Sequence, residues 1–88
     1  MEQKLILNDG TVLENTTALV ASGTLWVYIE SEITLGEAVA LLNDPEKTAV
    51  MTEVEFGNEK IYTGYTDLFC VRREDNGQVN AGLKKAVE

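Results

Sequence analysis

The sequence contains no histidine and a single cysteine among its 88 residues. The absence of histidine removes the most common general base, the most common zinc ligand and the usual partner of a nucleophilic serine or cysteine. Cys70 cannot form a disulfide within the chain, and its place in an apolar run indicates a small core residue. No P-loop and no dinucleotide-binding glycine motif is present. We therefore expect a protein that is not an enzyme and that uses no cofactor or metal.

Long apolar segments are also missing from the sequence. None approaches the roughly 20 residues that cross a bilayer. The first ten residues have neither the apolar stretch nor the small-residue cleavage site of a signal peptide. A lone cysteine agrees with a reducing compartment. The expectation is one domain over residues 1–88, in the cytoplasm and without contact to a membrane.

Basic residues are scarce, with seven Lys and Arg against fifteen Asp and Glu, for a formal charge of −8. Residues 1–59 hold eleven acids and two bases, whereas residues 60–88 hold four acids and five bases. Such a chain repels nucleic acid and anionic membranes, so we expect no direct binding of nucleic acid. The acidic charge either serves solubility alone or attracts a partner protein with a basic surface. Salt bridges, either to the acidic half of the chain or to a second copy of it, are expected for the four bases that the last hairpin brings together: Arg72, Arg73, Lys84 and Lys85.

Three turn signals predict β-hairpins. Asp9-Gly10 lies between apolar runs and predicts a type I′ turn, and Asn76-Gly77 gives the strongest hairpin signal in the chain. A two-residue turn at Ser22-Gly23 predicts a third hairpin, in which opposed residues share a face. Its register pairs Val20 with Leu25, Leu19 with Trp26, Ala18 with Val27, and Thr17 with Tyr28.

One short helix is expected over residues 35–43. Thr34 and Glu37 have the spacing of a capping box. An apolar stripe follows at helical spacing, and Asn43-Asp44-Pro45 ends it. A helix of this length needs packing against a sheet to be stable.

The remaining segments alternate as strands. In residues 48–56, the alternation predicts Val50, Thr52, Val54 and Phe56 on the core side, with Glu53 and Glu55 facing water. Gly57-Asn58 predicts a turn, and residues 59–73 then run on as one long strand. The alternation of apolar and polar residues is interrupted along this strand, which indicates either a bulge at Gly64 or burial of residues 68–71 on both sides. The fold class is α+β: an antiparallel sheet or half-open barrel of about six to seven strands, with one short helix packed on it.

Two pairs of acids stand two residues apart, Glu30 with Glu32 and Glu53 with Glu55. On a strand this spacing places both carboxylates on one face, with Cα atoms about 6–7 Å apart. A glycosidase or a metal site could use such a pair, but solvated strands carry the same pattern. We expect these four acids to lie on the surface.

Trp26 and Tyr28 point to the side of their strand opposite the apolar Leu25, Val27 and Ile29. One interpretation is that the helix covers this side, so that both faces of the hairpin are core. A second is that Trp26 is half-exposed and covers neighbouring backbone. The third is a docking surface or a homodimer seam that includes Leu19, and that Tyr62 and Tyr65 would extend if their strand lies alongside.

The segments LILNDGTVLEN and SGTLWVYI, followed by a short helix and a final Asn-Gly hairpin, resemble small uncharacterised proteins of bacteriophages and prophages in Firmicutes. The resemblance carries no catalytic motif. It implies a viral context, in which small acidic proteins either build the particle or disable a host protein by occupying its basic surface.

The first hypothesis is therefore a non-catalytic, phage-encoded binding protein in the host cytoplasm. It would inhibit a host protein with a basic surface, such as a nucleic-acid-binding or defence protein. The alternative is a homodimeric or larger structural component of the virion or its assembly. Acids would steer the partner and aromatic residues would anchor it. The predicted partner-binding residues are Leu19, Trp26, Tyr28, Glu30, Glu32, Glu53, Glu55 and Tyr62.

Overall fold

The computed structural model describes residues 3–86, so both ends of the predicted domain, residues 1–2 and 87–88, lie outside the description. The β-strands of the first half are β1 (Gln3–Ile6), β2 (Val12–Glu14), β3 (Thr16–Ala21) and β4 (Thr24–Ile29). Two helices follow, α1 (Leu35–Leu42) and α2 (Pro45–Thr48). The strands of the second half are β5 (Val50–Glu55), β6 (Asn58–Thr63), β7 (Asp67–Arg73) and β8 (Val79–Lys84).

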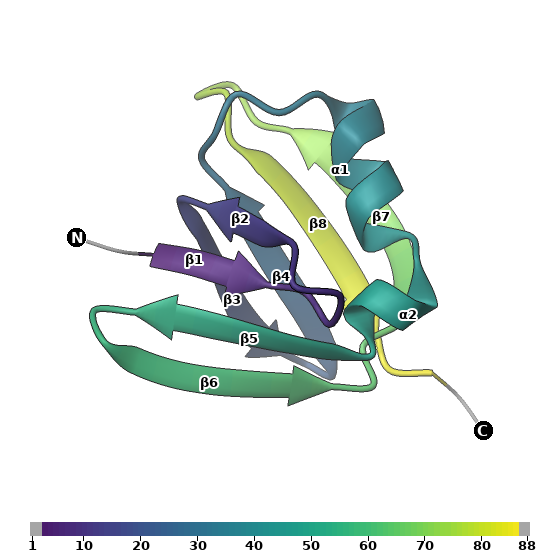
Figure 1. The fold of residues 1–88 in the computed structure, drawn as a ribbon. Helices are drawn as coiled ribbons and strands as arrows, with labels where there is room; N and C mark the ends of the chain where they lie inside the picture. The colour runs from purple at the N-terminus through teal and green to yellow at the C-terminus, as the bar shows by residue number, and fades with distance from the viewer. Residues whose placement is uncertain (1–2, 87–88) are drawn as a thin grey trace.

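The strands form two four-stranded sheets rather than one (Figure 1). Sheet A has the strand order β2-β1-β5-β6, and sheet B has the order β3-β4-β8-β7. All neighbouring strands are antiparallel. The α+β class is confirmed, but the predicted single sheet or half-open barrel of six to seven strands is wrong.

Two residues with positive φ carry the chain from sheet A to sheet B. Asn15, with φ of 51°, joins β2 to β3, and Gly64, with φ of 82°, lies between β6 and β7. The predicted strand over residues 59–73 is therefore wrong, because Gly64 divides it between the two sheets. The bulge is not at Gly64 either. It lies at Phe69, where the pairing of β7 with β8 shifts between Leu68 and Cys70.

All three predicted hairpins are present, with different turns. Ser22 and Gly23 both have positive φ, as a type I′ turn requires, and the predicted register of β3 with β4 is confirmed. At the other two turns only Gly10 and Gly77 have positive φ, so the type I′ prediction for Asp9-Gly10 is wrong. Five residues connect the strands in each of these hairpins.

The helix prediction is confirmed, and its N-terminus has the predicted capping box. The Glu37 amide donates to Thr34 Oγ1 at 3.1 Å, and the Thr34 amide donates to Glu37 Oε1 at 3.4 Å. Asn43 is the C-terminal cap of α1. The short helix α2 was not predicted. It begins after Asp44, whose side chain accepts from the Glu46 amide.

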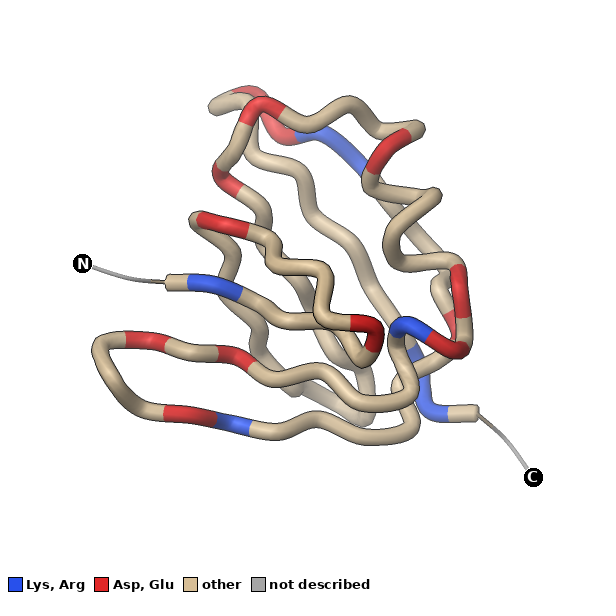
Figure 2. The backbone as a smooth tube through the Cα atoms, viewed as in Figure 1, with Lys and Arg blue, Asp and Glu red and all other residues tan. Residues whose placement is uncertain are grey.

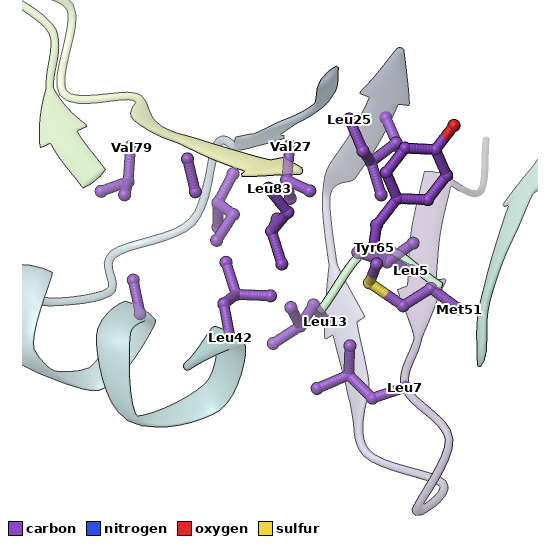
Figure 3. Packing of buried hydrophobic residues seen from close by; sticks show 14 residues of the cluster. Leu5, Leu7, Leu13, Leu25, Val27, Leu42, Met51, Tyr65, Val79 and Leu83 are labelled. Carbon is purple, nitrogen blue, oxygen red and sulfur yellow. The ribbon is translucent and has the colours of Figure 1, made fainter. Parts of the chain in front are cut away.

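Sheet A and α1 share one side of sheet B, with sheet A over β3 and β4 and α1 beside β7 and β8 (Figure 1). Figure 3 shows Leu42 of α1 between Leu13 of sheet A and Val79 and Leu83 of sheet B. Ala38 and Leu42 are fully buried in this common core. The side of sheet B that carries Trp26 is therefore not covered by the helix, and the interpretation that placed the helix there is wrong.

The two faces of β5 are the reverse of the prediction. Met51 and Glu53 are buried at 0% and 2% exposure, while Val50 is exposed at 38%. Phe56 lies outside the strand in a turn with Gly57, and both have positive φ, so the turn predicted at Gly57-Asn58 is displaced by one residue. Reading the apolar alternation alone therefore gave the wrong phase, because a buried carboxylate occupies one of the core positions of this strand.

Candidate functional site

The side of sheet B turned away from sheet A and α1 is here called the outer face of sheet B. The strand registers place Leu19, Trp26, Gly82 and Cys70 in one row across all four of its strands. Leu19 is 54% exposed, and Trp26 is partly buried. The prediction that Leu19, Trp26 and Tyr28 share a face is confirmed, and no other element of the described chain covers that face.

Phe69 joins this face because of the bulge in β7. Its ring meets the Trp26 indole edge to face, with ring centroids 5.8 Å apart and planes at 70°. Lys84 Nζ lies 4.8 Å from the centroid of the Phe69 ring on the same face. A Cβ atom on Gly82 would stand 2.8 Å from the Phe69 ring and 3.0 Å from Trp26. Only glycine at this position lets the two rings lie across β8.

Beside these rings the face is polar. Arg72 Nε donates to Glu74 Oε1 at 2.9 Å, and Asn80 Nδ2 donates to the same oxygen at 2.8 Å. A pocket of about 320 Å³ opens here, lined by Trp26, Tyr28, Cys70, Arg72 and Asn80. Cys70 is thus only half-buried and lines this pocket, so the prediction that it is a core residue is wrong.

Glu30 and Glu32 do not share a strand, because β4 ends at Ile29. Both are exposed in the segment that leads to α1. They line a polar pocket of about 370 Å³ together with Ser31, Arg73 and residues 76–78. Figure 2 shows acidic positions gathered where this segment passes the turn between β7 and β8. The two acids therefore lie at the end of sheet B where β4 ends and β7 turns into β8.

Glu53, Glu55 and Tyr62 lie elsewhere, and their predicted place in an exposed docking surface is wrong. All three point from sheet A toward sheet B. Glu53 accepts hydrogen bonds from the Ala18 amide of β3 and from the Tyr62 hydroxyl, each at 2.8 Å. Glu55 is partly buried and accepts from Gln3 Nε2 at 3.2 Å. The Glu53 carboxylate thus joins the two sheets instead of facing solvent.

Tyr62 belongs to this bridge rather than to the aromatic face. Burial and the hydrogen bond to Glu53 raise the pKa of the Tyr62 hydroxyl. Its ring packs against Tyr65, with centroids 6.5 Å apart. Because Tyr62 lies on the inner side of sheet A, it cannot extend the Trp26 surface.

Sequence reasoning missed four residues of the outer face: Phe69, Arg72, Asn80 and Lys84. A local signal existed for Arg72 and Lys84, which the last hairpin was expected to bring together. Nothing local indicated that β8 would pair with β4 and so place that hairpin next to Trp26. The bulge that turns Phe69 outward was expected at a different residue.

Comparisons with protein-family models, with curated proteins and with solved structures found no match. Among residues 3–86, no three His, Cys, Asp or Glu side chains lie close enough together to hold a metal ion. Within the same residues, no helix has the length and apolar character needed to span a membrane. Proposals about function therefore depend on the geometry of the outer face of sheet B.

Proposed function

We propose that this chain is a non-catalytic binding protein that docks on a partner protein through the outer face of sheet B. The observation that carries the proposal is a joined apolar and aromatic cluster on the side of the sheet that α1 leaves open, in which exposed Leu19 and Phe69 flank the partly buried Trp26. Leu19 is 54% exposed and Phe69 is 44% exposed. Aromatic clusters of this kind supply most of the binding energy at many protein interfaces.

The cluster is held in place before any partner arrives. Trp26 and Phe69 project from strands on either side of β8, and Gly82 of β8 leaves the space in which their rings meet. Rings fixed in this way lose little conformational entropy when they bind. This property suits docking better than it suits a surface that only needs to stay soluble.

Charge favours a partner with a basic region. Glu30 and Glu32 are exposed at one end of sheet B, and the chain carries a formal charge of −8. Exposed acids of this kind raise the rate of association with a basic protein and make it depend on salt. Inhibition of a nucleic-acid-binding or defence protein by a phage-encoded chain, as the sequence resemblance implies, is the form of docking that we propose.

Affinity capture from a lysate of a Firmicutes bacterium tests this function when the bait is compared with two variants. Leu19→Ser removes an exposed apolar side chain from the outer face of sheet B. Ile61→Ser does the same on the outer side of sheet A, where Ile61 is 65% exposed. A partner that is retained by the wild type and Ile61→Ser, and lost with Leu19→Ser, supports the proposal. Equal capture by all three baits contradicts it.

Steering by Glu30 and Glu32 is tested separately. The double substitution Glu30→Gln and Glu32→Gln should weaken capture of the same partner at low salt, and the difference should fade at high salt. If the double variant binds as well as the wild type at low salt, the two acids do not steer the partner.

A homo-oligomeric structural role is the second candidate, because the outer side of sheet A is also apolar. Its exposed residues include Val12, Val50 and Ile61, at 44%, 38% and 65% exposure. Exposed apolar patches on a small protein mark interfaces. Light scattering after size exclusion tests this role: an assembly whose mass falls on dilution, and is reduced by Ile61→Ser, supports it. A monomer at tens of micromolar contradicts it.

A further inference from the structure

The pocket beside Trp26 is small and has mixed chemistry. The Trp26 indole and Tyr28 phenol project from β4, and Arg72 projects from β7. Asn80 of β8 lies between them in the strand order, paired with both Tyr28 and Arg72. At about 320 Å³, the pocket is at the lower end of the range for ligand sites, so it fits one or two side chains rather than a nucleotide cofactor.

Arg72 is bonded to Glu74 through its Nε and has free donors at the other edge of its guanidinium group. Its Nε donates to Glu74, whose position is fixed by a second hydrogen bond from Asn80. The terminal amino groups of Arg72 make no hydrogen bond with any described residue, and its side chain is 73% exposed. A guanidinium held at Nε presents its terminal edge as a fork, which matches the two oxygens of a carboxylate.

Asn80, which lines the pocket, carries a second polar group without a partner among the described residues. Asn80 Oδ1 is buried and lacks a hydrogen-bond donor among residues 3–86. Buried acceptors without partners are uncommon in folded proteins.

We infer that the pocket accepts an acidic side chain of the partner protein that is next to an aromatic residue in the partner sequence. Arg72 would pair with the carboxylate, and Trp26 and Tyr28 would contact the aromatic ring. A polyanion is a poorer match, because the acidic chain repels it as a whole. The partner would therefore present both charges, a basic region toward Glu30 and Glu32 and a carboxylate toward Arg72.

This inference rests on the proposed function for its biological meaning, but a small probe tests the pocket without the partner. The probe is the capped dipeptide acetyl-Asp-Phe-amide, and its neutral control is acetyl-Asn-Phe-amide. Amide chemical shifts of the full chain are followed during titration, together with the indole N–H of Trp26, the only tryptophan in the sequence. We expect a saturable shift at residues that line the pocket, with millimolar affinity, and about fivefold weaker binding of the neutral control.

Three variants localise the effect. Arg72→Gln should reduce the affinity for the acidic probe to that for the neutral one, and Arg72→Lys should restore part of the difference. Lys60→Gln removes the same charge from an exposed position on sheet A and should bind the probe like the wild type. Equal affinity for the two probes, an unchanged response in Arg72→Gln, or no saturable shift each overturns the inference.

The experiments distinguish failure of the carboxylate-pocket proposal from failure of the proposed docking function. If neither probe binds, and Leu19→Ser still loses the captured partner, the docking face remains and the carboxylate assignment is wrong. If the acidic probe binds as expected, and Leu19→Ser captures the partner normally, the pocket is real and the proposed docking function is wrong.

Discussion

Replacing Tyr62 by phenylalanine should destabilise the protein through the bridge between the two sheets. The Tyr62 hydroxyl donates to Glu53 at 2.8 Å and lies 3.4 Å from the Ala18 carbonyl oxygen. Hydrogen bonds to charged groups contribute about 1.5–3 kcal/mol, and the partial exposure of Tyr62 places the expected loss near the lower limit, at about 2 kcal/mol. For a domain of this size that loss lowers Tm by about 10 °C.

Urea unfolding followed by tryptophan fluorescence measures the change in the free energy of unfolding. Tyr65→Phe is the matched control, because the Tyr65 hydroxyl makes no hydrogen bond to the described residues and its removal should cost less than about 0.5 kcal/mol. In a double-mutant cycle with Glu53→Gln, we expect a coupling energy of about 1 kcal/mol between Glu53 and Tyr62. Equal destabilisation by the two Tyr→Phe substitutions, or additive effects of Tyr62→Phe and Glu53→Gln, would show that the hydrogen bond between Tyr62 and Glu53 does not stabilise the contact between the sheets.

The remaining predictions concern pH, the aromatic face and the helix. Burial and Glu53 raise the pKa of Tyr62 above its ordinary value of 10.0, so the unfolded state loses the hydroxyl proton at a lower pH than the folded state. The free energy of unfolding should therefore fall as the pH rises above about 10, and it should fall less steeply in Tyr62→Phe. Urea unfolding at several pH values measures both slopes. Gly82→Ala should displace the Phe69 and Trp26 rings, cost about 1–3 kcal/mol and change the tryptophan emission. Gly36→Ala in α1, where the nearest atom is 4.0 Å from the added Cβ, should instead raise the free energy of unfolding by about 0.5 kcal/mol. Equal destabilisation by Gly36→Ala and Gly82→Ala would contradict this contrast. Thr34→Ala removes the capping box and should cost about 1 kcal/mol, whereas an unchanged midpoint in urea would show that the cap is dispensable.

The features that the sequence predicted correctly depend on neighbouring residues. The turn at Ser22-Gly23 fixes the register of β3 with β4 because it leaves no freedom in the loop. The capping box formed by Thr34 and Glu37 likewise lies within four residues. The register of β3 with β4 alone places Leu19, Trp26 and Tyr28 on one face, whatever the rest of the fold.

The features that the sequence did not predict depend on distant partners. Glu53 occupies a core position because the Ala18 amide, 35 residues earlier in the chain, and Tyr62 both donate to it. The alternation of apolar and polar residues places acids on the exposed side of a strand, so the buried and exposed faces of β5 were predicted the wrong way round. Gly64 suggested an irregularity, but its role in separating the two sheets follows from the pairing of β6 with β5 and of β7 with β8.

The pocket depends on the same long-range pairing. Arg72 and Asn80 reach Trp26 only because β8 pairs with β4, which is more than 50 residues earlier in the chain. A chain of this length offers several other strands with which β8 could pair. The sequence therefore predicted the aromatic half of the candidate site, and the polar half became visible only in the fold.

Binding of a partner by the outer face of sheet B can be measured by hydroxyl-radical footprinting of the captured complex. Oxidation is compared between the free protein and the complex at Trp26 and Phe69 on that face, and at Phe56 and Ile61 of the β5–β6 hairpin in sheet A. We expect strong protection of Trp26 and Phe69 in the complex, with Phe56 and Ile61 oxidised as in the free protein. Protection confined to Phe56 and Ile61, with Trp26 fully reactive in the complex, would contradict it.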